Sequence, residues 1–442
     1  MSTPREASEL IEVRFLRIGM YVELDVGWLA HPFPTGSFRI ISEKQIDTIR
    51  GLGQARIRWV PSRSELTATE AAQTPGAAQA ASQAGEREEA QRREAQARQE
   101  RADLLAAQQR SLTVCEKRFN EATRLYRKTV EQVHSHPKEA AEQAHSMVAG
   151  LLQDMLGEGD SIIRLLSESA GDKSAMHPVN VTIVSLLLGK AMGMPRDALQ
   201  DLGTAAYLHD IGKIQLPERV RWFEDNFSSA EYKLYQDHVA QSVLLGKGMS
   251  LSRAALLAIA QHHELADGTG FPARIKSESM SPAARILALV NRYDNLCNPS
   301  RVATALTPHE SLALIFAQMK TRFDSVALSA FIRMMGVYPP GSVVQLIDDR
   351  YAIVVSVNSS RPLKPRILVH EPGVPRHEAL IVDLEQMPFL GIRRSLKPSA
   401  LPQASLDYLA PRQRITYYFE QVEAPLAPQS GSTEPEAPKS DA

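Results

Sequence analysis

Two histidine-rich strings constrain this chain more than any other feature of its 442 residues. The first, AAYLHDIGKI, places His209 directly before Asp210, and the second, HHELADGTGFP, begins at His262 and ends at Pro272. An imidazole beside a carboxylate supplies a nitrogen ligand and an oxygen ligand that can bridge two cations. The His262–His263 pair supplies nitrogen ligands for the second cation. The two strings together predict a binuclear metal site.

Five histidines share apolar helical surroundings. Leucine, isoleucine, valine or alanine precedes or follows them at spacings of three, four or seven residues, which points the imidazoles inward on a helix. A single inward histidine is more simply a hydrogen-bonded core residue. A shared metal site explains the whole set, because Asp210 and Glu264 stand beside two of its members. The set comprises His177, His209, His238, His262 and His263.

Nitrogen ligands with a bridging carboxylate suit Fe, Mn, Zn, Ni or Co. Two such ions about 3.5–4 Å apart generate hydroxide at neutral pH and stabilise an in-line phosphoryl displacement. Other chemistries lack their motifs, since the chain contains neither G-x-x-x-x-G-K-[ST] nor G-x-S-x-G. Lysines and arginines are scattered without interleaved aromatics, so we expect no nucleic-acid partner.

Composition narrows the class of protein further. A net charge of −1 argues against whole-chain binding to nucleic acid or to an anionic membrane. The two cysteines, Cys115 and Cys297, lie far apart and outside any C-x-x-C, which excludes a disulfide scaffold and fits a reducing compartment. The chain begins without the pattern of a signal peptide and has no apolar run of about 18 residues, so we expect a cytoplasmic protein without a membrane span.

The pattern along the chain predicts a mainly α protein with a helical bundle core, a small N-terminal α+β domain and a small C-terminal β-rich segment. The N-terminal core is expected to hold Trp28, Phe33, Phe38 and Trp59, and a hairpin is expected around Asp348. The charged connector is predicted to be a solvated helix, with a homodimer as the alternative. The expected parts are the α+β domain at 8–62, a linker at 63–86, the connector at 87–135, the bundle at 136–338, the β-rich segment at 340–420 and a disordered tail at 421–442.

At this point the residues resemble a known family. His177, the string HDIGK at 209–213, His238 and the string at 262–272 are similar to the HD-GYP family of the HD superfamily of metal-dependent phosphohydrolases. The resemblance covers about 170–302 and implies an HD-type helical bundle. It also implies hydrolysis of the bacterial second messenger cyclic di-GMP, to pGpG and/or GMP, through a metal-bound hydroxide. The N-terminal part resembles a domain of uncharacterised function that often precedes HD-GYP.

The resemblance also implies roles for single residues. His177, His209 and Asp210 would ligate one metal, and His238, His262 and His263 would ligate the other, with Asp210 bridging. The metals would be two divalent ions, Fe or Mn first and Zn, Ni or Co as alternatives. Lys213 would place its ammonium at a phosphate oxygen, which makes Asp210 and Lys213 the expected catalytic residues. The expected substrate-binding residues are Lys213, Asp267, Gly268, Gly270, Phe271 and Arg301.

Three departures from the family pattern matter. Phe271 replaces the tyrosine of GYP, so the ring can stack on a guanine but the phenol hydrogen bond is lost. Asn291 stands where the family has a metal-binding aspartate, and it can offer a carbonyl oxygen without charge, while Asp294 lies three residues on as a candidate substitute. Lys173 stands where three-metal members carry an acidic residue, which favours two metals.

Two functions remain open from the sequence. The first is a working cyclic di-GMP phosphodiesterase, favoured by the complete set of histidines and Asp210. The alternative is a degenerate HD-GYP protein that acts as a non-catalytic cyclic di-GMP sensor or scaffold, with a GGDEF-type cyclase or other signalling domain as partner. Action on another phosphorylated nucleotide also remains open, because the HD superfamily is chemically broad.

Overall fold

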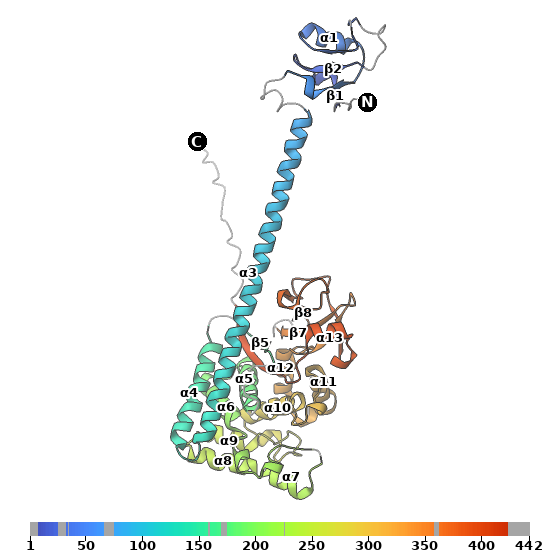
Figure 1. The fold of residues 1–442 in the computed structure, drawn as a ribbon. Helices are drawn as coiled ribbons and strands as arrows, with labels where there is room; N and C mark the ends of the chain where they lie inside the picture. Colours follow the sequence, from blue (N-terminus) through green and yellow to red (C-terminus); the bar gives the residue numbers. More distant parts are fainter. Residues whose placement is uncertain are drawn as a thin grey trace, which may run out of the picture. The chain divides into compact units, whose positions relative to one another are not determined.

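The computed structural model describes residues 8–24, 32–33, 35–65, 75–157, 160–168, 175–224, 226–357 and 362–422. The chain divides into two compact units, Met1–Ala102 and Asp103–Ala442, each described here by itself (Figure 1). Trp28 and Lys173 lie outside the described residues, as does the predicted tail beyond Val422.

The first unit contains a four-stranded antiparallel sheet in the order β1-β4-β2-β3. Trp59 and the isoleucines of strand and helix form its core, with Phe33 and Phe38 packed against them. Gly53, two residues after the end of the helix, lies in the left-handed region with φ +72° and closes it. The elements are β1 (Glu9–Glu12), β2 (Tyr21–Glu23), β3 (Ser37–Arg39), α1 (Glu43–Gly51) and β4 (Arg56–Trp59).

A long helix, α3 (Pro75–Gln132), follows. It begins inside the segment expected to be a linker, because the alanines and glutamines there are strong helix formers. Residues 86–104 are exposed, and the ion pairs Glu89–Arg93 and Glu94–Arg98 join neighbouring turns. This stretch has the character expected of a solvated helix.

The second unit has a mainly helical core, as predicted for an HD-type bundle (Figure 1). Proline stands at the start of three of these helices, where its missing N–H is not needed. The helices are α4 (Pro137–Met155), α5 (Met176–Ala191), α6 (Arg196–Leu208), α7 (Ser229–Gln236), α8 (His238–Gly248), α9 (Arg253–Gln261), α10 (Pro282–Cys297), α11 (Pro308–Gln318) and α12 (Ser325–Met335).

The C-terminal segment forms a seven-stranded antiparallel sheet with one strand from the helical region. Strand β5 (Asp160–Leu165) lies between β7 and β11, and the β6–β7 hairpin turns at Asp349, whose φ is +67°. β8 pairs with β7 and β9, and β10 pairs with β6. The remaining elements are β6 (Val343–Leu346), β7 (Tyr351–Val357), β8 (Arg366–Val369), β9 (Ile381–Asp383), β10 (Ile392–Leu396), α13 (Gln403–Leu409) and β11 (Tyr417–Val422).

One hydrophobic cluster runs through the helices and this sheet. It joins Val179 and Leu186 of α5 to Phe331 of α12 and to Val344 and Tyr417 of the strands. The β-rich segment therefore shares its core with the bundle. Among the described residues, no helix is both long and apolar enough to cross a membrane.

Candidate metal centre

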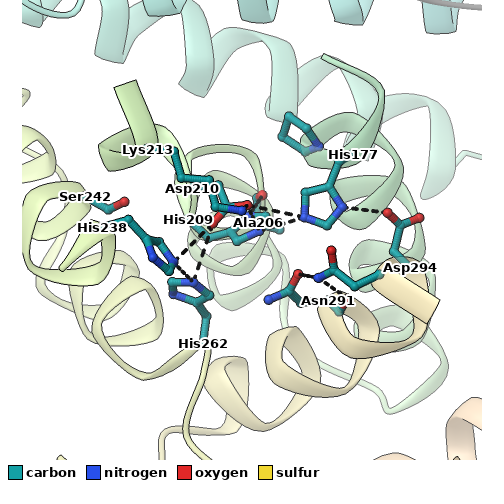
Figure 2. Close-up of polar contacts among 12 residues, drawn as sticks. His177, Ala206, His209, Asp210, Lys213, His238, Ser242, His262, Asn291 and Asp294 are labelled. Atoms are coloured by element: carbon teal, nitrogen blue, oxygen red, sulfur yellow. Dashed lines mark hydrogen bonds and ion pairs between the residues drawn. The ribbon is translucent and has the colours of Figure 1, made fainter. Parts of the chain in front are cut away.

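The five histidines stand at helix ends that meet at one place, and Figure 2 shows four of them, His177, His209, His238 and His262. His177 lies in the first turn of α5, and His238 opens α8. His209 directly follows α6, and His262 and His263 directly follow α9. The structure therefore brings together all the histidines that the sequence singles out.

Gly212 permits this approach, a role that the sequence analysis missed. A Cβ atom at this position would lie 2.3 Å from the backbone oxygen of His238 and 2.3 Å from the backbone nitrogen of Ser242. The amide of Gly212 also donates to Ser242 Oγ at 2.8 Å. The turn after Asp210 can therefore lie directly against α8, which places His238 beside that carboxylate.

Backbone carbonyls fix the tautomer of three of the imidazoles. Nδ1 of His209 donates to the carbonyl of Ala206 at 2.7 Å, and Nδ1 of His262 donates to that of Ile259 at 2.6 Å. Nδ1 of His238 donates in the same way to the carbonyl of Tyr235 at 2.5 Å. A carbonyl only accepts, so in the neutral rings Nε2 carries the lone pair.

Two of these lone pairs point at each other, because Nε2 of His238 lies 3.3 Å from Nε2 of His262. Nε2 of His263 lies 3.1 Å from Nε2 of His238, and the Nε2 atoms of His177 and His209 are 3.2 Å apart. The neutral rings of His238 and His262 are both acceptors at Nε2, and two acceptors cannot form a hydrogen bond with each other. A cation between them would satisfy both, and the fixed Nδ1 bonds are the usual support of metal-binding histidines.

Asp210 lies between two groups of ligands. In the His177 group (His177, His209, Asp210), Oδ2 of Asp210 lies 3.5 Å and 3.4 Å from the two Nε2 atoms. In the His238 group (Asp210, His238, His262, His263), Oδ1 lies 3.4 Å from His238 and 3.8 Å from His262. Oδ1 is buried without a hydrogen-bond partner among the described residues, which is costly unless a cation faces it. The residues of both groups, which share Asp210, could therefore hold metal ions.

The electrostatics support ligation in the His238 group. Burial lowers the pKa of His238 to about 4 and holds the pKa values of His262 and His263 well below the usual 6.5. Burial opposes ionisation of Asp210, but Lys213 and the neighbouring histidines outweigh it and hold its pKa well below 3.8. Neutral imidazoles around an ionised carboxylate are the state that binds metal.

His177 differs because it faces two carboxylates. Burial lowers its pKa, but hydrogen bonds to Asp210 and Asp294 outweigh that effect and raise the pKa to about 9. Its Nδ1 donates to Oδ2 of Asp294 at 2.6 Å, which leaves Nε2 for the site (Figure 2). A cation in the His177 group would therefore displace a proton from Nε2.

Asn291 and Asp294, both on α10, make different contacts. Asp294 bonds the outer nitrogen of His177, so it orients this ligand and does not substitute for Asn291. Asn291 is buried and lines the cleft beside the site, and its Oδ1 accepts a hydrogen bond from Asn295 Nδ2 at 2.7 Å. Glu264 does not join the histidines, because it accepts the amides of Ala273, Arg274 and Ile275.

Lys213 is buried beside Asp210. Its Nζ lies 2.6 Å from Oδ2 of Asp210 and about equally far, 5.5 Å, from the ring centres of Trp222 and Tyr235. The ammonium thus lies at the wall of the cleft with aromatic faces around it.

A cleft of about 850 Å³ opens over the metal centre. Its aromatic residues come from the 222–235 region and from the loop after α9, and the sequence analysis missed all but Phe271 because they follow no motif. Its arginines come from α10, the loops on either side of α11 and the segment before β11. The aromatic residues are Trp222, Phe223, Tyr232, Tyr235 and Phe271. The arginines are Arg292, Arg301, Arg322 and Arg414.

The loop residues fall into different places. Phe271 lines the cleft and stacks on the ring of His263, with ring centres 4.4 Å apart and an interplanar angle of 20°. Gly270 lies against the backbone of residues 263–265, where a Cβ would come within 2.4 Å of an amide nitrogen. Oδ1 of Asp267 accepts a hydrogen bond from the amide of Thr269, and Asp267 does not line the cleft. Gly268 adopts the left-handed region, with a φ of +79°.

Arg301 stands at the rim of the cleft. Its side chain is 57 % exposed and its Nη2 lies 2.7 Å from Oε2 of Glu224. The structure thus places it in the cleft but pairs it with a carboxylate.

Comparisons with known proteins agree with this geometry. Residues 161–326 match the HD domain family, and residues 9–144 match a domain of unknown function, DUF3391. A cyclic di-GMP phosphodiesterase of Pseudomonas aeruginosa is 24 % identical over 365 residues, which cover 81 % of this chain and 84 % of that protein. Cyclic di-GMP phosphodiesterase PdeB of Borreliella burgdorferi is 25 % identical over 192 residues, 43 % of this chain and 51 % of PdeB.

A solved structure, the HD-GYP-type protein Bd1817 of Bdellovibrio bacteriovorus, is 16 % identical. The match has a TM-score of 0.36 and covers 74 % of this chain and 98 % of that one. The family matches confirm both resemblances read from the motifs.

Proposed function

We propose that this chain, whose residues 161–326 match the HD domain family and whose residues 9–144 match DUF3391, is a metal-dependent phosphodiesterase that hydrolyses cyclic di-GMP to pGpG and/or GMP. The observation that supports this most directly is Asp210. One of its oxygens faces the His177 group and the other, without a hydrogen-bond partner among the described residues, faces the His238 group. The curated relatives named as cyclic di-GMP phosphodiesterases support the choice of substrate.

The His177 group and the His238 group would each hold one divalent ion, with Fe or Mn as the first expectation. When bound, such a pair lowers the pKa of a water molecule and neutralises charge on a phosphoryl oxygen. The backbone carbonyls that bond the Nδ1 atoms of His209, His238 and His262 hold the imidazoles in position beforehand. This preorganisation spares the reaction the cost of orienting the ligands.

The cleft would bind the rest of the substrate. Its exposed aromatic faces, Trp222, Phe223 and Tyr232, suit stacking on guanine bases. Lys213 would turn its ammonium from Asp210 to a non-bridging phosphate oxygen and oppose the charge that grows there in the transition state. Arg301 and the other rim arginines would attract the phosphodiester anion.

The test is an assay of the full chain purified without metal and reconstituted with Mn²⁺ or Fe²⁺. We expect loss of cyclic di-GMP and appearance of pGpG or GMP, with the activity abolished by a chelator and in Asp210→Ala. Cyclic GMP–AMP and pGpG, assayed in parallel, define the substrate class. Intact cyclic di-GMP after incubation with the doubly metallated protein would overturn the proposal.

Asn291 supports a second candidate, a cyclic di-GMP sensor without turnover. Its Oδ1 already accepts a hydrogen bond from Asn295, and the amide brings no charge to the metals. Tight binding of cyclic di-GMP by the metallated protein without products would favour this candidate. A GGDEF-type cyclase or other signalling domain would then be the expected partner, while self-association through α3 stays a prediction. Either function acts on an intracellular messenger, so we expect the protein in the cytoplasm.

A further inference from the structure

Asp294, which orients His177, is itself held by two asparagines. Asn180 of α5 and Asn298, the residue after α10, both donate through Nδ2 to Oδ1 of Asp294, the second at 3.0 Å. Oδ2 of Asp294 then remains for Nδ1 of His177, at 2.6 Å. Both oxygens of this buried carboxylate are thus committed, and its orientation is fixed.

The two asparagines are in turn held by the C-terminal segment. The amide of Tyr417 donates to Oδ1 of Asn180 at 2.8 Å, and the amide of Ile415 donates to Oδ1 of Asn298 at 2.7 Å. The carbonyl of Ile415 accepts from Nδ2 of Asn298 at 2.8 Å and from Nδ2 of Asn180 at 3.4 Å. Backbone amides can only donate, so they decide which way each side-chain amide faces, and the Nδ2 atoms must face Asp294.

This segment is firmly placed. Tyr417 is fully buried, and its hydroxyl lies 3.1 Å from the hydroxyl of Tyr293 and from the carbonyl of Pro340. Strand β11 pairs with β5 along its whole length. Ile415 also lines the cleft. Ile415 and strand β11 lie outside 161–326, the part that matches the HD domain.

We propose that the segment from Ile415 to Tyr417 is a positioning element for the metal centre, acting through Asn180, Asn298 and Asp294 on His177. The proposal rests on the metal site of the proposed function. It assigns the C-terminal segment a part in catalysis, because the segment sets how firmly the His177 group holds its ion.

The effect is selective between the two groups of ligands. His238 and His262 are oriented by the carbonyls of Tyr235 and Ile259, each three residues earlier in the chain, and His263 stacks on Phe271. None of the hydrogen bonds in the Asp294 network reaches these three rings. Loss of an outer hydrogen bond to a metal-binding histidine weakens affinity by about 10–100-fold. We therefore expect that loss for one ion and little change for the other.

The test is a titration of the full-length, metal-free protein with Mn²⁺. Calorimetry measures the affinity for each ion, and metal analysis measures the number of ions bound per chain. Asn180→Ala should retain one tight ion and lose affinity for the other by about 10–100-fold. Ser185→Ala is the matched control, because Ser185 is buried on the same helix and its hydroxyl has no hydrogen-bond partner among the described residues. The control should bind both ions like the wild type.

A second variant separates positioning from loss of stability. Asn298→Ala removes the other donor to Asp294, so it should lower the affinity for the same ion. Because Asn298 is half-buried, this variant should fold. The proposal would be overturned if Asn180→Ala and Asn298→Ala both bound the two ions with the affinities of the wild type. It would also be overturned if either variant lost affinity for the two ions equally. If the wild type itself bound no metal, the proposed function would fail instead, so the two failures are distinguishable.

Discussion

The ammonium of Lys213 lies 2.6 Å from Oδ2 of Asp210, the carboxylate shared by both groups of ligands. In the absence of metal, the lysine is the buried counter-charge of this carboxylate. Cations in the two groups would take over that task and release the ammonium toward the cleft. Under the proposed function, the same lysine would serve stability before metal binding and phosphate recognition after it.

Replacing the lysine should separate these two effects. In Lys213→Gln we expect kcat to fall by about 10²–10³-fold, because a positive charge at the transition state is lost. The metal-free variant should also melt earlier, since an unpaired buried carboxylate costs about 3–5 kcal/mol. Mn²⁺ should raise its melting temperature by more than it raises that of the wild type. A variant with wild-type kcat would refute the role of Lys213.

Asn291→Asp tests the departure from the family pattern. Restoring a carboxylate beside the His177 group should tighten binding of one ion by about tenfold and raise activity at low metal concentration. Titration with Mn²⁺ and initial rates at several metal concentrations measure both. If the wild type were a sensor without turnover, this variant is where turnover should emerge. Weaker metal binding in Asn291→Asp would place residue 291 outside the coordination sphere.

Phe271 stacks on His263, a proposed metal ligand, so its loss should affect metal binding before substrate binding. Phe271→Ala removes an aromatic contact with His263 that is worth about 0.5–1.5 kcal/mol. The affinity of the His238 group for its ion should therefore fall by about 2–10-fold. Phe271→Tyr keeps the ring and should bind metal like the wild type. Calorimetry on both variants provides the measurement. A change confined to KM would mean that the ring contacts only the nucleotide.

The stability of the metal-free protein should peak near pH 6.5. His238, His262 and His263 have pKa values below their ordinary 6.5, so the stability they contribute is present above pH 6.5 and is lost as the pH falls toward 4. For His238 alone the loss is about 3 kcal/mol. His177, with its pKa raised to about 9, contributes stability below pH 6.5 that is lost as the pH rises through 9.

Melting temperatures between pH 4 and pH 9 in a chelator would measure this dependence. His238→Gln should flatten the acid side of the curve and leave the alkaline side unchanged. A curve with no acid limb in the wild type would contradict the neutral state assigned to the buried imidazoles.

The sequence singled out the histidines that the structure brings together, because apolar residues at helical spacings surround each of them. Asp210 and His209 are adjacent, and apolar residues at spacings of three and four precede His209 on α6. Whether these ends meet is not a local property, but five inward imidazoles leave few alternatives. The resemblance to a family then supplied roles that periodicity alone could not give.

The rest of the site depends on pairings between distant segments. Asn180 meets Tyr417, and Asp294 meets His177, and no periodicity relates residues so far apart. The role of Glu264 was also hidden, because a carboxylate beside a metal-binding histidine looks like a ligand until its three amide donors are seen. Likewise β5 lies inside a run of helices, and its partner strands are in another part of the chain.

The place of β5 makes the catalytic part of the chain hard to excise. This strand precedes α5–α12, yet both its neighbours, β7 and β11, follow them. A fragment ending at residue 338, shortly after α12, would leave both edges of β5 bare and open to pairing between molecules. The helices α5–α12 are thus inserted between β5 and the strands that pair with it. Pairing between strands so far apart in the sequence slows folding. Cleavage after α12 would therefore damage the enzyme at its centre and not merely trim its periphery.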